Sequence, residues 1–284
     1  MPLKRLPRST RKSTRVRVEK EEIVIVPVGE IVNPRTYALY GRAGTGKTTL
    51  AGSFPKPALL LDVNDRGTDS VSDIEGIDVI EVKTWGLFEA IYWDMMDDPD
   101  RYEKYKTIII DTLSMVQQLC VEEVLRRKKK NTENAGQWGS MTRREWGDVS
   151  QEMKSWIVRY RDLPKNIVFI AQDRVNKGGG EDEDDYEEDE LMPEVGPALS
   201  PAVAKVLNAA VYVIGNTFIR RHVVVKGKGK EAVRKERIQY CMRVGPNPIY
   251  ITKIRKPKSV GAPDIIIDPT YDDIAEIIEG DSNG

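Results

Sequence analysis

The chain has 284 residues, of which 40% are apolar, and this is enough for the core of one large α/β domain with tails. Its formal net charge of −1 is uninformative, because its 44 basic and 45 acidic residues are partly gathered in separate segments. The two cysteines and one histidine lack CxxC or HxxxH spacing, which argues against a structural zinc site. The low cysteine content and the lack of any apolar run near about 18 residues favour a cytoplasmic protein without a membrane segment.

The N-terminal segment is basic and is predicted to be a flexible arm over residues 1–22. Residues 1–17 contain seven Lys or Arg and no acidic residue. Such an arm either binds nucleic acid phosphates, with Arg11 and Arg15 among its contacts, or is a soluble tail. The apolar stretch that follows at 23–28 is too short and too late for a signal peptide. We expect residues 23–280 to form a single domain.

Apolar runs of strand length recur through this domain and alternate with helical patterns. Apolar residues at three- and four-residue spacing predict helices at 87–96, 113–127 and 146–160. Several strand runs are almost continuously apolar, as in parallel strands covered on both faces, so we predict an α/β fold with a mostly parallel, doubly wound sheet and an antiparallel C-terminal extension. The predicted strands lie at 23–28, 36–40, 57–63, 77–82, 106–111, 166–172, 209–215, 222–225, 237–244 and 248–254.

Two polar segments are long for simple connections. Residues 131–141 join two predicted helices, and residues 173–196 contain a triple glycine followed by nine acidic residues within 181–190. We expect the loop at 173–196 to be disordered. Its acidic run would repel a phosphate backbone, so two further interpretations stay open: a mimic that covers a basic surface of the protein itself, or a docking site for a basic partner.

The strongest motif follows the strand at 36–40. Gly41, Gly46, Lys47 and Thr48 satisfy G-x-x-x-x-G-K-[ST], in which glycines let backbone N–H groups surround a β-phosphate. Lys47 is expected to reach the β- and γ-phosphate oxygens and Thr48 to bind Mg²⁺, with a helix N-terminus adding its positive dipole end. The predicted nucleotide-binding residues are Gly41, Arg42, Ala43, Gly44, Thr45, Gly46, Lys47, Thr48 and Thr49.

Two later strands end in side chains that fit a nucleotide site. Thr107–Asp111 is an apolar run that ends in a carboxylate, and Asp111 is predicted to orient Mg²⁺ directly or through water. The strand at 166–172 ends in Gln172, whose amide could sense the γ-phosphate and signal to the following loop. Asp111 and Gln172 therefore join Lys47 as candidate catalytic residues.

The glycine-rich phosphate-binding loop at 41–48 (the P-loop), the sequence IIIDT at 108–112 and the strand ending in Gln172 resemble the RecA-like P-loop ATPases. Over about residues 36–278 the pattern is similar to phage nucleotide-binding proteins with a RecA-type core, some of which act in single-strand annealing or recombination. The resemblance implies ATP and Mg²⁺ as cofactors and single-stranded DNA as a partner. It also implies a homo-oligomeric ring or filament in the host cytoplasm, with a single-strand binding protein or helicase as a further partner.

The resemblance also extends to the C-terminal part, with one departure. Lys253 and Arg255 resemble the K-x-R pair that RecA-like assemblies insert into a neighbour's nucleotide site, although a basic strand end is often only a solvated edge. RecA-like ATPases carry a glutamate after the strand that follows the P-loop helix, and here that position is Asn64. Either Asp65 replaces this glutamate with a shorter reach, or hydrolysis is slow.

In a RecA-like core the loops after the helix at 113–127 and after Gln172 would face DNA. Lys128, Lys129, Lys130 and Trp138 offer phosphate charge and a stacking ring, although a solvated helix end and a core tryptophan fit equally well. A GTPase fits poorly, because the D-x-x-G match at 73–76 comes before its strand instead of after it and the residues at 176–179 lack the final Asp of N-K-x-D. A small-molecule kinase also fits poorly, because the basic run at 126–130, which could mimic its arginine-rich lid, ends a helix. A helicase loader of AAA+ type, a partition-type ATPase, or a nucleotide-gated adaptor of a replication complex remains an alternative.

Overall fold

The computed structural model describes residues 34–64, 67–131, 141–176, 193–226 and 233–280. The predicted basic arm and the predicted strand at 23–28 lie outside this part of the chain. Residues 34–280 belong to one unit in which all the elements below are found. No helix within the described ranges is both long enough and apolar enough to cross a membrane.

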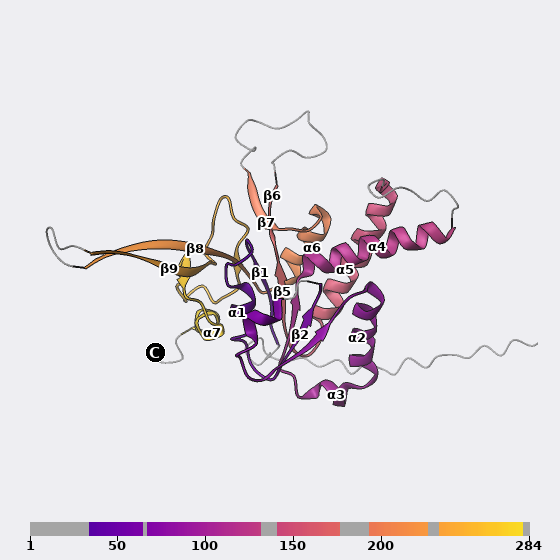
Figure 1. The fold of residues 1–284 in the computed structure, drawn as a ribbon, viewed down its shortest axis with the longest axis horizontal. Coiled ribbons are helices and arrows are strands. Elements are labelled where there is room, and N and C mark those ends of the chain that lie inside the picture. Colours follow the sequence, from indigo (N-terminus) through magenta and orange to yellow (C-terminus); the bar gives the residue numbers. More distant parts are fainter. Residues whose placement is uncertain (1–33, 65–66, 132–140, 177–192, 227–232, 281–284) are drawn as a thin grey trace, which may run out of the picture. The chain divides into compact units, whose positions relative to one another are not determined.

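A nine-stranded sheet forms the centre of the unit (Figure 1). Along the sheet the strand order is β11-β9-β8-β1-β5-β4-β2-β3, and β10 pairs with β8. The pairs from β8 through β3 are parallel, whereas β9, β10 and β11 pair antiparallel with their neighbours. The strands are β1 Thr36–Tyr40, β2 Ala58–Asp62, β3 Ile77–Glu81, β4 Thr107–Asp111, β5 Asn166–Ala171, β8 Val213–Lys226, β9 Val233–Arg243, β10 Lys253–Ile254 and β11 Ile265–Ile267.

Helices cover both faces of this sheet. Alternate side chains of the central strands point to opposite faces, and each face forms its own apolar core with the helices that pack on it. In β4, Ile108 and Ile110 pack with residues of α2, α4, α5 and α6, whereas Ile109 packs with residues of α1 and α7. The mostly parallel α/β sheet predicted from the sequence is confirmed. The helices are α1 Lys47–Ala51, the 3₁₀ helix η2 Gly67–Val71, α2 Trp85–Asp97, α3 Pro99–Glu103, α4 Leu113–Asn131, α5 Arg143–Arg161, α6 Pro201–Ala210 and α7 Tyr271–Glu279.

The three helices predicted from apolar spacing are confirmed as α2, α4 and α5. Local sequence explains where two of them begin. The hydroxyl of Thr84 accepts a hydrogen bond from the backbone N–H of Leu87 at the start of α2. At the start of α5, Thr142 and Glu145 form a reciprocal capping box, which satisfies two backbone donors that the helix itself cannot pair.

Three predictions about strands and loops need correction. The loop expected at 173–196 begins and ends in two antiparallel strands, β6 Asp173–Asn176 and β7 Glu194–Pro197, while the acidic run at 181–190 lies outside the described residues. The strand expected at 209–215 begins only at Val213, because residues 209–210 end α6, and it joins the strand expected at 222–225 as one strand, β8, because residues 216–221 continue the pairing with β9. Of the strand expected at 248–254, only β10 pairs as a strand with β8, since residues before it make a single bridge to β7.

Tyr40, at the end of β1, connects the central sheet to the β6–β7 hairpin. Its ring is fully buried, and its hydroxyl donates to the backbone oxygens of Val195 in β7 and Ile251 before β10, at 2.9 and 2.8 Å. The hydroxyl therefore holds β7 and the segment before β10 against the strand that leads into the P-loop.

Replacing Tyr40 by Phe should destabilise the protein by about 1–2 kcal/mol, because buried carbonyl oxygens lose a hydrogen-bond donor while packing is retained. For a domain of this size that corresponds to a decrease of roughly 3–6 °C in Tm, measurable by circular dichroism or calorimetry. An unchanged Tm would show that the two hydrogen bonds contribute nothing net to folding.

Candidate nucleotide site

The sheet topology brings three functional segments to one edge. β5 lies between β1 and β4, and the backbone N–H of Gly41 donates to the carbonyl oxygen of Ala171 at 3.4 Å. The carboxyl ends of these parallel strands therefore meet at the edge where ligands bind in open α/β sheets. The P-loop after β1, Asp111 at the end of β4 and Gln172 after β5 lie together there, although they are far apart in the sequence.

The P-loop has the backbone expected of a phosphate-binding loop. Gly44 and Gly46 have φ values of 77° and 82°, a left-handed conformation that glycine adopts without steric cost. The buried Lys47 ammonium donates to the carbonyl oxygens of Gly41 and Arg42 at 2.9 and 2.8 Å, so it lies over the mouth of the loop. Its position lets it exchange these carbonyls for phosphate oxygens.

Thr48 and Asp111 form the second part of the site. The Thr48 hydroxyl, in the first turn of α1, donates to Oδ2 of the buried Asp111 at 2.7 Å. A Cβ placed on Gly67 would lie 3.6 Å from the same carboxylate oxygen and 3.9 Å from the Thr48 hydroxyl, so the backbone after β2 passes close to this pair. A hydroxyl and a carboxylate are hard oxygen ligands that suit Mg²⁺, and both predicted metal ligands are thus brought together.

Gln172 lies between the P-loop and the start of α4. Its backbone N–H donates to the Ser114 hydroxyl at 3.2 Å, and its carbonyl oxygen accepts from the backbone N–H of Ala198 at 2.7 Å. Because β6 begins at the next residue, Gln172 connects the phosphate side of the site directly to the β6–β7 hairpin.

A family comparison agrees with this geometry. A family model described as an AAA domain matches residues 33–255, which is most of the chain. The chain belongs to this family of AAA-type P-loop NTPases. Nucleotide binding and ATPase activity, with Mg²⁺ as the usual cofactor, are therefore what the family indicates for it. No curated protein matches the chain.

A pocket of about 610 Å³ continues from the P-loop of the AAA domain. Its wall includes Gly46 and the ring of Tyr240 on β9, since a Cβ on Gly46 would lie 3.1 Å from that ring. Asp268 holds Tyr240 in place by accepting from its backbone N–H at 3.2 Å and donating its own N–H to the Tyr240 carbonyl at 2.6 Å. The wall also includes Thr49, Thr217, Pro269 and Thr270.

This half-open, partly apolar pocket beside the phosphate loop has room for a base and ribose. Tyr240 and Thr217 are far from the P-loop in the sequence, and no sequence motif singles them out. The alternation of side chains along a strand does not show that Thr217 and Tyr240 are on the face of the sheet that lines the pocket. Pro269 and Thr270 lie beyond the region matched by the AAA domain.

Residues of β8, in the C-terminal part of the sheet, also contact the P-loop and the end of β1. The hydroxyls of Thr45 and Thr217 lie 2.7 Å apart, and the buried Asn216 donates its Nδ2 to the carbonyl of Tyr40 at 3.5 Å. A Cβ on Gly41 would lie only 2.3 Å from the Thr217 carbonyl oxygen, so glycine is required there for close backbone approach.

Two predicted catalytic cations lie away from the P-loop of their own chain. Lys253 donates to the carbonyl oxygens of Asn208 and Val211, both at 2.7 Å, and Arg255 donates to that of Ala209 at 3.1 Å. Both therefore cap the carboxyl end of α6, a favourable position for cations. Partial burial lowers the pKa of Lys253. Their predicted action on a neighbouring subunit stays a prediction.

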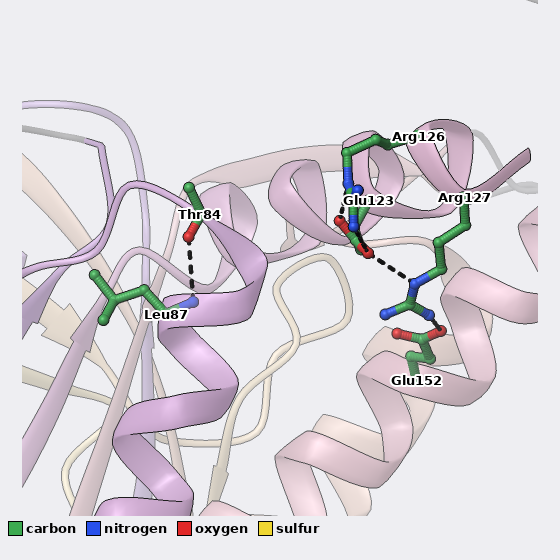
Figure 2. A network of polar contacts seen from close by, with 6 residues as sticks. All are labelled: Thr84, Leu87, Glu123, Arg126, Arg127 and Glu152. Atoms are coloured by element: carbon green, nitrogen blue, oxygen red, sulfur yellow. Dashed lines mark hydrogen bonds and ion pairs between the residues drawn. The ribbon is translucent and has the colours of Figure 1, made fainter. Parts of the chain in front are cut away.

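The basic end of α4 is paired with acids of the protein itself. Figure 2 shows Arg127 between Glu123 on α4 and Glu152 on α5, at 2.8 and 2.6 Å, while Arg126 also binds Glu123 at 2.7 Å. Hydrogen bonds from Arg126 and then Arg127 lower the pKa of Glu123 to about 2. This network ties α4 to α5.

The predicted nucleic acid contacts are only partly described. Lys128 forms an ion pair with Glu145 of the α5 capping box, and this contact lowers the pKa of Glu145. Lys129 and Lys130 lie in the last turns of α4, whose side chains there are outside the described set. Trp138, Arg11, Arg15 and the predicted catalytic residue Asp65 also lie outside the described residues, so these assignments stay predictions.

Replacing Tyr240 by Ala should weaken ATP and ADP binding about tenfold, because an aromatic contact with a base contributes on the order of 1–3 kcal/mol. Tyr240→Phe is the matched control and should bind both nucleotides nearly as wild type does. Titration with a fluorescent ATP analogue measures both affinities. Inorganic triphosphate, which has no base, should compete equally well in all three proteins.

Equal ATP affinity in wild type and Tyr240→Ala would mean that the base does not lie against this ring. Failure of triphosphate to compete in Tyr240→Ala would instead indicate that the substitution has displaced the P-loop.

Proposed function

We propose that this protein is a RecA-like ATPase that binds ATP with Mg²⁺, hydrolyses it, and couples this cycle to single-stranded DNA in annealing or recombination. The observation that carries the nucleotide part is the Thr48–Asp111 hydrogen bond at the end of a P-loop whose carbonyl oxygens bind the Lys47 ammonium. One edge of the sheet thus offers phosphate donors, a cation and hard metal ligands in a single place.

Each group has a defined task in this proposal. The P-loop N–H groups and Lys47 bind the phosphate oxygens, and Lys47 neutralises charge that develops between the β- and γ-phosphates. Thr48 and Asp111 would hold Mg²⁺ directly or through water, and the metal would supply further charge neutralisation when bound. Gln172 responds to the γ-phosphate.

A conformational change at Gln172 can be transmitted to neighbouring elements through few residues. β6 starts at the next residue and pairs with β7, which the Tyr40 hydroxyl ties back to the strand before the P-loop. Movement of Gln172 would therefore change the β6–β7 hairpin relative to β1. This supports a nucleotide-dependent change in a segment that the RecA resemblance assigns to DNA contact.

The proposal includes an oligomer. Lys253 and Arg255 cap α6 within the chain, and in a ring or filament in the cytoplasm of the host cell they would also have to approach a neighbour's γ-phosphate. A single-strand binding protein or a helicase is the further partner expected for such an assembly.

ATP hydrolysis with and without single-stranded DNA tests the proposal most directly. Wild type should hydrolyse ATP faster with DNA, and Lys47→Ala should reduce the rate at least about 100-fold, because the transferring phosphate no longer has this charged donor. Circular dichroism checks that the variant is folded. Hydrolysis that Lys47→Ala leaves unchanged would refute the assigned site, and hydrolysis that DNA does not change would refute the coupling.

The second candidate function is a nucleotide-gated adaptor of a replication complex, and Asn64 favours it. Asn64 follows β2, is exposed and has a φ of 55°, and Gly67, three residues later, lies beside the Thr48–Asp111 pair. An amide cannot accept a proton from an attacking water as a carboxylate does. Slow turnover with tight binding would suit a switch that acts while ATP stays bound.

Replacing Asn64 by Asp should raise the hydrolysis rate about tenfold if a missing base limits turnover, since general bases contribute at least that much. Asp tolerates the left-handed conformation as Asn does, so little backbone strain is added. Asn64→Gly is the matched control and should not accelerate hydrolysis. A rate unchanged by Asn64→Asp, measured by phosphate release under saturating ATP, would show that position 64 does not limit turnover.

A further inference from the structure

Strands β8 and β9 continue well beyond the sheet as a two-stranded arm (Figure 1). β1 pairs with β8 only as far as Asn216, and β11 pairs with β9 from Cys241 to Arg243. From Thr217 to Lys226, and from Val233 to Tyr240, the two strands pair with each other and with no other described strand. An isolated two-stranded ribbon is at best marginally stable in water, so the presence of such an arm indicates that it has a function.

The register gives the arm two different faces. Arg220 pairs with Gln239 and His222 pairs with Arg237, so these side chains share one face. Ile219 pairs with Tyr240 and Arg221 pairs with Ile238, which places these four on the other face. We call the face with Arg220, His222 and Arg237 the basic face. All three of these residues are exposed, whereas the opposite face exposes Ile219, Tyr240 and Ile238.

The whole arm is strongly basic in sequence. Residues 219–238 contain eight Lys or Arg and two Glu. Arg220 on β8 and Arg237 on β9 lie on the basic face two residues apart along the arm, so their charges are separated by about 6.8 Å in that direction. Separated single cations suit the repeating single charges of a phosphate backbone.

The inner end of the basic face adds planar groups. Phe218 lies two residues before Arg220 on the same face, and the Arg243 guanidinium lies over the rings of Phe218 and Tyr250, at 3.6 and 4.2 Å from the centroids. Cations interleaved with aromatic rings are typical of single-strand nucleic acid sites. An anionic membrane or an acidic peptide would supply the charge but would not require these rings.

We propose that the basic face of the β8–β9 arm binds the phosphate backbone of nucleic acid, single-stranded in preference to duplex. This inference rests on the DNA-coupled function proposed above and assigns to the arm a DNA contact that adds to the β6–β7 hairpin and takes the place of residues 1–22 and the end of α4. A single strand lying along the basic face would reach Phe218 and Tyr250 at the base of the arm.

The arm is also connected to the P-loop. Arg243 donates Nη1 to Oδ1 of the buried Asn216 at 2.7 Å, and Asn216 donates to the carbonyl of Tyr40, the residue before Gly41. A nucleic acid strand that draws on Arg243 would weaken its bond to Asn216. Occupation of the basic face would then alter the support behind the P-loop, which gives DNA a physical route to the hydrolysis rate.

The test uses the full chain and fluorescence anisotropy with a labelled oligonucleotide, in single-stranded and duplex form. Arg220→Gln combined with Arg237→Gln should weaken single-strand binding at least tenfold. It should also lower the slope of log affinity against log salt by about 1.4, or about 0.7 for each phosphate that the protein no longer neutralises. Arg221→Gln removes the same type of charge from the opposite face and is the matched control. It should change the affinity by less than about twofold.

The outcomes separate this inference from the proposed function. If the double variant binds as wild type does while deletion of residues 1–20 abolishes binding, the arm assignment is wrong and the DNA-coupled function stands. If wild type binds neither oligonucleotide at low salt, both are wrong. If Arg221→Gln weakens binding as much as the double variant, the charge of the arm matters but the assignment to one face is wrong. Tighter binding of duplex would refute the single-strand preference. Unchanged binding of a fluorescent ATP analogue shows that each variant is folded.

Discussion

The position of β5 between β1 and β4 is the constraint on which the candidate site depends. Neighbouring strands lie about 4.8 Å apart, so one intervening strand leaves roughly 10 Å between the P-loop strand and the strand that ends in Asp111. The first turn of α1 spans this gap, and Thr48 meets the Asp111 carboxylate at 2.7 Å. The same arrangement places Gln172, which follows β5, between the two halves of the site.

The antiparallel C-terminal extension takes part in building the site. Thr217 and Asn216 on β8 support the P-loop, and Tyr240 on β9 forms one wall of the neighbouring pocket. Both strands then continue into the arm whose basic face carries Arg220 and Arg237. Because the same two strands line the pocket beside the P-loop and carry the arm, the coupling proposed above would run through β8 and β9.

The basic residues in the sequence indicate a phosphate-binding surface only where the structure shows which groups each side chain contacts. The basic run at the end of α4 looks available in the sequence, yet Arg127 and Lys128 bind Glu152 and Glu145 of α5. Exposed ion pairs of this kind contribute little to stability, but they remove charge from the surface offered to phosphate. In the sequence, the strands of the arm look less basic than the end of α4, because their basic residues are separated by valines and glycines.

The sequence by itself determined the local features: the P-loop, the apolar strand ending in Asp111, the three amphipathic helices and the mostly parallel sheet. The first three depend on residues within one loop, strand or helix, and the mostly parallel sheet was inferred from the order of such segments along the chain, so local patterns reveal them. Tertiary structure decided the strand order, the single long strand β8 and the pairing of β6 with β7. It also decided the roles of Tyr240, Asn216 and Arg243, because their contacts join residues far apart in the chain. Pairing register and strand order arise from long-range packing, and a local pattern of side chains does not encode which distant strand becomes a neighbour.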